Sequence, residues 1–257
     1  MKSTARSSPI DLSNDAQFWA MRAKKYNQLE WANKGDYLHA FLNAGNFHED
    51  DQVLDVGTGT GIIAHTVSPF VRKVVGIDIS NEMLKRAKNP SFKNIQWRRM
   101  DSHDLHFPDE TFDKVTARMV FHHILKKTQA AMNECYRVLR EGGRMIFSEG
   151  VPPTSHVVPF YTEMFKLKEE RLTFMEKDLL GLMKRAGFKR IQKDILWLRQ
   201  SSIRNWLGSS GLPKPTQDKI FQMHLSLDEQ GKKDYAMRIK KGDCFIDMKF
   251  VILTGKK

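Results

Sequence analysis

Three glycines at a spacing of two residues, Gly57, Gly59 and Gly61, follow a short apolar run at residues 53–56. Glycine admits a positive φ and lets the backbone approach a ligand with no Cβ in the way. A helix beginning near Ile62 would turn its free N–H groups and the positive end of its dipole toward that ligand. The pattern predicts a buried strand, a tight turn and a ligand site at the start of a helix.

A second apolar run, residues 74–77, ends in Asp78, about seventeen residues beyond the turn. A carboxylate at this place in a doubly wound α/β fold accepts hydrogen bonds from the ribose of a nucleotide. The dinucleotide fingerprint, however, needs a glycine at its sixth position, where this chain has Ile62. Asp55, inside the first strand, has no role in a pyrophosphate site either. A nicotinamide-dependent oxidoreductase is therefore disfavoured.

The glycine turn with Asp55 and Asp78 resembles the class I S-adenosylmethionine (SAM)-dependent methyltransferases, within them most closely the ubiquinone/menaquinone-biosynthesis type of small-molecule methyltransferase. Residues 105–115 and 136–143 carry the same resemblance, which extends from about residue 53 to residue 149. It implies a Rossmann-like, doubly wound, seven-stranded and mostly parallel sheet with helical cap insertions. It also implies methyl transfer from SAM, with S-adenosylhomocysteine as the product.

The resemblance assigns the cofactor contacts. The glycine turn would pack against the methionyl and ribose parts of SAM, and Asp78 would bind the ribose diol. Asp101, with Ser102 beside it, would hold the adenine amino group, although a turn carboxylate is the alternative for Asp101. The expected set is Asp55, Gly57, Thr58, Gly59, Gly61, Asp78, Ile79, Met83, Asp101, Ser102, Arg118 and Met119.

Methyl transfer requires the donor carbon and the nucleophile to be held close together, water to be excluded and, for oxygen or carbon nucleophiles, a proton to be accommodated. His122 and His123 follow the fourth expected strand and have ordinary pKa values suited to a base. We expect one of them to be catalytic, the alternative being a packing or hydrogen-bonding role. Neighbouring residues of a strand or helix point apart, so we predict no metal site.

On the substrate side, Tyr26, His156 and Tyr161 are candidate contacts, and Glu149 is a weaker candidate base. Tyr26 belongs to an aromatic N-terminal segment that could form a lid over SAM and substrate or pack on the edge of the sheet.

The chain divides into a flexible N-terminus and a single methyltransferase domain. We expect a flexible segment at 1–13, N-terminal helices within 14–45, a core at 50–200 and 243–257, and cap insertions at 152–175 and 201–242. A capping box at 173–176 would open a helix that Gly187 ends. The insertion 201–242 departs from the simplest family members and makes a quinone precursor doubtful as substrate. A peripheral bundle or a homodimer surface is the alternative for this insertion.

The net charge is +12, and the basic residues are expected to lie on solvated faces or to favour an anionic small substrate. Nucleic acid is disfavoured, because no basic stretch alternates with stacking aromatics and residues 117–120 lack the two prolines typical of amino-directed nucleic-acid methyltransferases. Two cysteines exclude a disulfide framework. With no leader and no apolar run of about 18 residues, we expect a soluble cytoplasmic protein without a membrane span.

These features predict a SAM-dependent methyltransferase acting on a small-molecule acceptor, anionic or aromatic in character. Two alternatives stay open. One is a nucleic-acid methyltransferase or RNA-binding protein, and the other is a SAM-binding scaffold without catalysis. The sequence identifies neither the methylated atom nor the oligomeric state.

Overall fold

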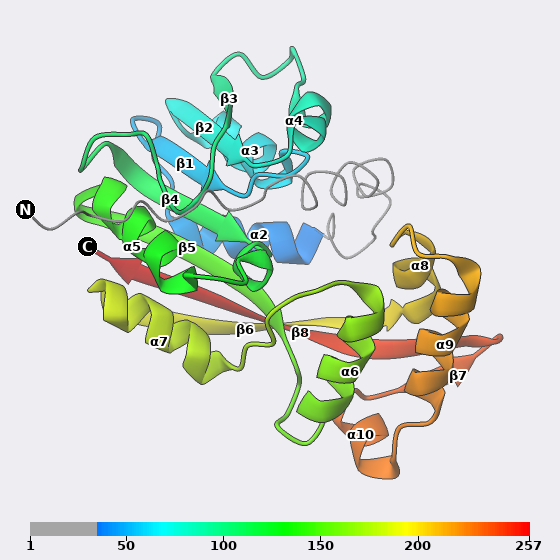
Figure 1. Ribbon diagram of the computed structural model, residues 1–257. Coiled ribbons are helices and arrows are strands. Elements are labelled where there is room, and N and C mark those ends of the chain that lie inside the picture. The colour runs from blue at the N-terminus through cyan, green and yellow to red at the C-terminus, as the bar shows by residue number, and fades with distance from the viewer. Residues whose placement is uncertain (1–34) are drawn as a thin grey trace, which may run out of the picture.

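The computed structural model describes residues 35–257, which form a central sheet covered by helices on both faces (Figure 1). Its strands are β1 (Gln52–Val56), β2 (Lys73–Asp78), β3 (Ile95–Arg99), β4 (Phe112–Arg118), β5 (Leu139–Val151), β6 (Lys189–Ser202), β7 (Arg238–Lys240) and β8 (Asp243–Lys256). They lie in the order β3-β2-β1-β4-β5-β8-β6, and the short β7 pairs with β8. The predicted doubly wound fold is confirmed, with β7 as an eighth strand beyond the seven expected.

The first five strands pair in parallel, and β8 runs antiparallel between β5 and β6. The helical elements are α2 (Gly35–Gly45), α3 (Ile62–Val67), η3 (Ser68–Phe70), α4 (Asn81–Ala87), η4 (Phe121–His123), α5 (Thr128–Val138), α6 (Val158–Lys168), α7 (Glu176–Ala186), α8 (Ile203–Gly208), α9 (Lys214–Leu225) and α10 (Glu229–Asp234). No helix within residues 35–257 combines the length and the apolar character needed to cross a lipid bilayer.

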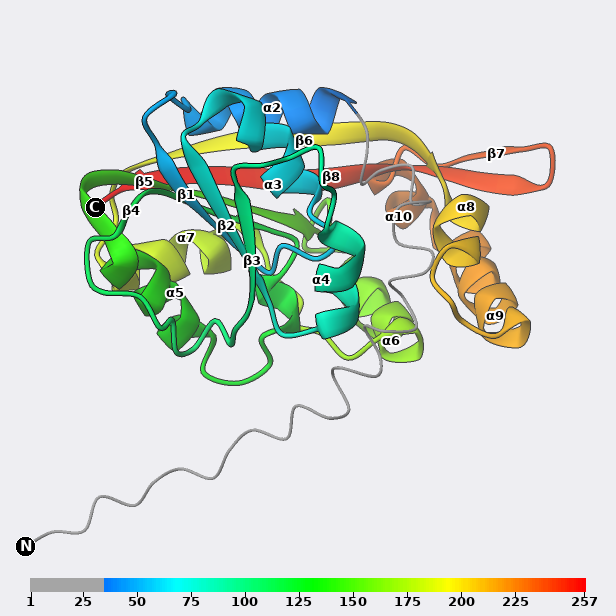
Figure 2. The ribbon, with the colours of Figure 1, turned by 90° about the horizontal axis from the view of Figure 1, so that it is seen from above.

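Each face of the sheet carries its own apolar core, because successive side chains of a strand point to opposite faces. Val53 of β1 packs with residues of α2 and α3, whereas its neighbour Leu54 packs with residues of α5 and α7. Figure 2 shows these two pairs of helices on opposite sides of the strands. Because β1 to β5 run parallel, their carboxyl ends lie at the same edge of the sheet, and the candidate site lies at this edge.

Local signals explain several helix ends. Ser80 caps α4, its hydroxyl accepting from the Met83 N–H at 3.3 Å, and Gly187 ends α7 with φ 104°, the second as predicted. The predicted capping box at 173–176 is wrong. α7 begins only at Glu176, and the Asp178 carboxylate accepts from the Met175 N–H at 2.8 Å. α5 ends at Val138, because β5 begins at Leu139 and includes Gly142 and Gly143.

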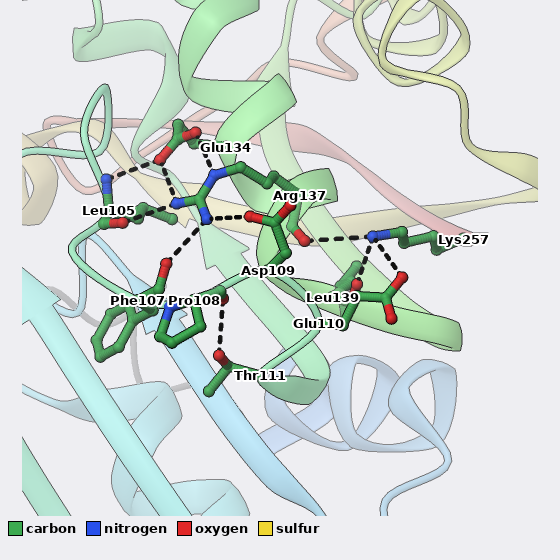
Figure 3. Close-up of polar contacts among 10 residues, drawn as sticks. All are labelled: Leu105, Phe107, Pro108, Asp109, Glu110, Thr111, Glu134, Arg137, Leu139 and Lys257. Carbon is green, nitrogen blue, oxygen red and sulfur yellow. Dashed lines mark hydrogen bonds and ion pairs between the residues drawn. The ribbon is translucent and has the colours of Figure 1, made fainter.

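The loop that leads into β4 is fixed by Arg137 of α5 (Figure 3). Its guanidinium donates to the carbonyls of Leu105 at 2.7 Å and Phe107 at 2.8 Å and to the carboxylate of Asp109 at 2.7 Å. Glu134, one turn earlier on α5, pairs with Arg137 and accepts from the Leu105 N–H at 2.8 Å. This network ties the loop before β4 to the helix after it, and so sets the position of β4.

The helices α6, α8, α9 and α10 gather around the far ends of β6 and β8 (Figure 1). They come from both predicted insertions, and they pack through aromatic rings. The ring centroids of Phe165 and Trp206 are 5.8 Å apart, and those of Phe160 and His224 are 5.1 Å apart. We call these four helices the cap. The division of the chain at 152–175 and 201–242 stays a prediction.

Candidate functional site

The glycine turn joins β1 to α3. Gly57, Gly59 and Gly61 have φ of 63°, 56° and 82°, all in the left-handed region that favours glycine. A Cβ on Gly57 would lie 2.2 Å from Cγ2 of Val120, whereas a Cβ on Gly59 would meet no atom within 4 Å. Gly57 is thus required by packing, and Gly59 has room beside it for a ligand.

Asp78 ties this turn to the start of α4. One carboxylate oxygen accepts from the Gly59 N–H at 2.8 Å, and the other accepts from the Ser80 N–H at 2.9 Å. Burial raises the pKa of Asp78 above its ordinary value, against the lowering effect of these backbone bonds. Each oxygen keeps a second lone pair, so the carboxylate can also accept from ligand hydroxyls. Of the two predicted cofactor contacts near Asp78, Ile79 is half-buried, and Met83 of α4 is buried.

Asp55 lies behind the turn. Its carboxylate accepts from the hydroxyls of Thr58 at 2.5 Å and Thr116 at 2.7 Å, and burial raises its pKa to about 6. We therefore infer that Asp55 maintains the conformation of the glycine turn.

Asp101 follows the end of β3. One of its carboxylate oxygens accepts from both the backbone N–H and Nδ1 of His103, as expected for a carboxylate that stabilises a turn. This bond to His103 lowers the pKa of Asp101, and Ser102 beside it is half-buried.

The end of β4 is conformationally unusual. Met119 has φ 57°, a left-handed conformation that is uncommon for residues other than glycine and that occurs at functional sites. Its Sδ accepts from the Gly150 N–H at 3.0 Å, which joins the ends of β4 and β5. The preceding Arg118 is buried, with its guanidinium 5.2 Å from the centre of the Tyr37 ring. This conformation directs the chain into η4, which carries both histidines.

His122 is held by Glu149, which is buried at the end of β5. Nδ1 of His122 and a Glu149 oxygen are 2.5 Å apart, and the other oxygen accepts from the N–H groups of Val120, Phe121 and His122 at 3.1, 2.7 and 3.4 Å. Burial raises the pKa of Glu149 to about 7, while Arg171 and these N–H groups act to lower it. Sequence analysis placed Glu149 on the substrate side. The structure instead places it behind His122, as the group that orients the ring.

The ring of His123 lies 4.0 Å from that of His122, centroid to centroid. With Glu169, the two histidines offer three ligand atoms within 4.8 Å of one another. Neighbouring side chains point apart on a strand or an α-helix, but these histidines lie on a 3-10 turn that brings their rings together, so that expectation is wrong here. Glu169 is already ion-paired, with Lys168 at 2.8 Å and with Arg171 at 3.6 Å.

A pocket opens between η4 and the cap, and we call it the acceptor pocket. Its walls are mainly aromatic and apolar, and they also include the charged side chains of Lys168, Glu169, Arg171 and Lys249. It is lined by Met119, His122, His123, Gly150, Val151, Tyr161, Met164, Phe165, Lys168, Glu169, Arg171, Trp206, His224, Tyr235, Ile246, Met248, Lys249 and Phe250. His224, a wall residue from α9, is buried, and this burial lowers its pKa to about 4, so the imidazole is neutral.

Of the predicted substrate contacts, Tyr161 lines the pocket, and its hydroxyl donates to the Gly150 carbonyl at 3.4 Å. His156 is an exposed partner of Asp228, 3.1 Å away, and is not among the residues that line the pocket. Tyr26 lies outside the described residues.

Sequence reasoning missed the charged segment Lys168, Glu169 and Arg171 and the wall residue Trp206. A charged run after a helix usually lies on the surface, so the residue types alone gave no signal that these side chains are buried. A tryptophan in an insertion likewise predicts core packing without identifying a pocket.

A family model described as a methyltransferase domain matches residues 54–147. The chain is 22% identical to the uncharacterized methyltransferase YcgJ of Bacillus subtilis (strain 168), over 96% of this chain and 100% of that protein. The crystal structure of YcgJ superposes with a TM-score of 0.76 at 21% identity, covering 87% of this chain and 99% of that one.

Two further similar proteins have names that state the molecule they methylate. The chain is 40% identical to the demethylmenaquinone methyltransferase of Tropheryma whipplei (strain Twist) over 43% of its length, and it spans less than half, 46%, of that protein. A phosphoethanolamine N-methyltransferase 2 of Haemonchus contortus, in complex with phosphomonomethylethanolamine and S-adenosylhomocysteine, has a TM-score of 0.68 at 18% identity. This match covers 96% of this chain and 59% of that one.

Proposed function

Because residues 54–147 form a SAM-dependent methyltransferase domain, we propose that this chain transfers a methyl group from SAM to a small molecule held in the acceptor pocket. The observation that carries the proposal is a wall shared by two sites. Val120 packs against Gly57 of the glycine turn, and Met119, the preceding residue, lines the acceptor pocket. A donor on the turn and an acceptor in the pocket therefore meet at the end of β4.

The residues of the turn suit SAM. Gly59 leaves open space where a side chain would stand, and the Asp78 carboxylate beside it can accept from the ribose hydroxyls. Asp55, through Thr58, keeps the turn in this shape. When bound there, SAM supplies an electrophilic methyl group on a sulfonium. The chain then has to position the acceptor, exclude water and receive a proton.

His122 is the residue best placed to receive that proton. When Glu149 is ionised and accepts the Nδ1 proton, Nε2 is the basic nitrogen of the neutral ring. Glu149 also stabilises the imidazolium once Nε2 has taken up a proton, as a buried carboxylate does for a catalytic histidine. His122 lines the pocket, so an acceptor hydroxyl, thiol or ammonium group can come within its reach.

The acceptor is a small molecule with an aromatic or apolar body. The rings of Phe165 and Trp206 form part of the pocket wall, and an enclosed apolar site with a few polar groups is typical of small-ligand binding. The demethylmenaquinone methyltransferase named above, 40% identical over 43% of this chain, supports a small-molecule acceptor.

The first test is calorimetric titration of the full chain with SAM, S-adenosylhomocysteine and NADH. We expect micromolar binding of both adenosyl ligands and none of NADH. Labelled-methyl transfer into small-molecule extracts then identifies the acceptor, and His122→Asn should keep S-adenosylhomocysteine affinity while losing turnover. If neither adenosyl ligand binds, the proposed function is refuted.

A further inference from the structure

One buried nitrogen in the acceptor pocket lacks a partner. Among residues 35–257, Nη2 of Arg171 is the buried side-chain nitrogen for which no hydrogen-bond partner is found. The Arg171 side chain is 3% exposed and lines the pocket. Buried donors in folded proteins are nearly always satisfied, and an orphaned one calls for a ligand or a water. Since arginine carries five N–H donors and no acceptor, the missing partner must be an acceptor.

The guanidinium is fixed in place. It lies 4.2 Å from the centre of the Phe165 ring, Nε donates to the Leu172 carbonyl at 3.3 Å, and Nη1 is 3.6 Å from Glu169. The Leu172 N–H in turn donates to the His122 carbonyl at 2.8 Å, so the segment carrying Arg171 is attached directly to the turn carrying His122. Nη2 is therefore held in a defined position close to the residue proposed to receive the proton.

The charges around Arg171 favour an anion. Glu169 is ion-paired with two buried cations, with Lys168 at 2.8 Å and with Arg171 at the longer distance of 3.6 Å. Glu149, the other buried acid here, is hydrogen-bonded to His122 and to the Phe121 N–H, and burial raises its pKa while the charge of Arg171 acts to lower it. Lys249, also in the wall, is paired with Glu176 at 2.7 Å. The Arg171 guanidinium therefore has one long ion pair and one unmet donor, and an anionic oxygen at Nη2 would give it a charge-assisted hydrogen bond.

We infer that Arg171 binds an anionic oxygen group of the methyl acceptor, a carboxylate or a phosphate, through Nη2. The inference rests on the proposed function and narrows its acceptor to molecules that carry such a group beside an apolar or aromatic body. Arginine suits this task because its planar N–H groups match carboxylate and phosphate oxygens. The divalent-metal alternative at His122, His123 and Glu169 is weaker, since a cation there would add charge beside Lys168 and Arg171.

The test compares matched probes by calorimetry, with and without S-adenosylhomocysteine. The probes are 4-hydroxybenzoate, phenyl phosphate and the neutral 4-hydroxybenzamide. We expect wild type to bind at least one anion about tenfold or more tightly than the amide, as a charge-assisted hydrogen bond provides. Comparing the affinities of the two anions shows whether the site prefers a carboxylate or a phosphate.

Arg171→Met should bring the anion-to-amide ratio close to one, and Arg171→Lys should keep part of the preference while preserving the charge beside Glu169. The matched control is Arg204→Met, because the Arg204 guanidinium lies 4.1 Å from the Phe221 ring in the same stacked way but outside the pocket. This control should keep the wild-type ratio.

The inference is overturned if wild type prefers neither anion, or if Arg171→Lys and Arg171→Met both retain the full preference. It is also overturned if the preference survives Arg171→Met but disappears with a chelator, which would instead assign the anion to a metal at His122, His123 and Glu169. Probe binding does not require SAM. Failure of the adenosyl titration and failure of the anion test are therefore separate results.

Discussion

At the scale of single residues, Asp78 is the group whose removal tests the cofactor site. Asp78→Ala should weaken S-adenosylhomocysteine binding by about 1.5–3 kcal/mol, the range for hydrogen bonds to a charged group. Calorimetry of the full chain measures this loss, with Asp104→Ala as the control because that side chain is 79% exposed. Wild-type affinity in Asp78→Ala would remove Asp78 from the site.

Glu149 gives the molecule a pH dependence whose sign follows from its burial. Its pKa is about 7 in the fold, against an ordinary value of 4.5. A raised pKa means that the contribution to stability is present below the unfolded pKa and is lost as the pH rises through 7. Between about pH 5 and pH 8, wild type should lose up to about 3 kcal/mol of unfolding free energy relative to Glu149→Gln.

Thermal melts at both pH values measure this difference. The exposed pair of Glu163 with Lys166 provides the control, and Glu163→Gln should follow wild type. Parallel pH profiles for wild type and Glu149→Gln would show that the burial of Glu149 has no such cost.

Residues that belong to a sequence motif could be predicted as site residues, whereas residues whose role depends on being buried could not. The three glycines, Asp78 and the two histidines lie at or shortly after the ends of strands, so their types and spacing indicated a site. Glu149 and Arg171 have no such mark, because an acid at a strand end or an arginine after a helix is usually exposed. Their roles depend on what the fold packs over them. The cofactor and catalytic roles assigned to individual residues stay predictions.

At the scale of elements, the Arg137 network holds the approach to β4. Arg137→Ala removes donors to the Leu105 and Phe107 carbonyls and leaves Glu134 without its partner. We expect a loss of about 2–3 kcal/mol in unfolding free energy, since several bonds to a charged group disappear together. Urea unfolding measures it. Arg140→Ala, which removes a more exposed pair with Asp113, should cost less, and equal losses would contradict this assignment.

Elements with a local signal were predicted best. The strand, glycine turn and helix at residues 53–67 follow from apolar alternation and from glycine chemistry. The start of α7 was misplaced because Asp178, Glu176 and Thr173 all offer acceptable capping chemistry, and tertiary contacts decide among them. Glu176 is instead engaged by Lys193 and Lys249, at 2.5 and 2.7 Å.

At the scale of the whole molecule, the comparisons confirm the predicted family resemblance, fold class and class of enzyme. The pocket was not predictable, because it forms where two insertions far apart in the sequence pack together. No motif marks residues 201–242, and only tertiary structure brings Trp206 opposite Phe165.

Trp206 lines the acceptor pocket, whereas Trp97 lies against the glycine turn, so we expect substitutions of these two tryptophans to weaken the binding of different ligands. Trp206→Leu should weaken binding of the pocket probes and leave S-adenosylhomocysteine binding unchanged. Trp97, whose ring lies 2.7 Å from where a Cβ of Gly61 would stand, supports the glycine turn, so Trp97→Leu should weaken the adenosyl ligand instead. A change of about tenfold in each case is measurable by calorimetry. Equal effects of both variants on both ligands would show that the two sites are not separable.

The long strands β6 and β8 have a further consequence for how the protein can move. Each has 14 residues, and their pairing is interrupted between Leu198 and Ser201 but resumes at Ser201 and Ser202, in the region of the cap. Hinge closure takes place where a few loop residues absorb large backbone changes, but here a paired ribbon crosses the junction. The cap therefore cannot swing as a clamshell without breaking ladder hydrogen bonds. Acceptor exchange would depend on local helix and side-chain rearrangement, and selectivity would be fixed by a preformed shape.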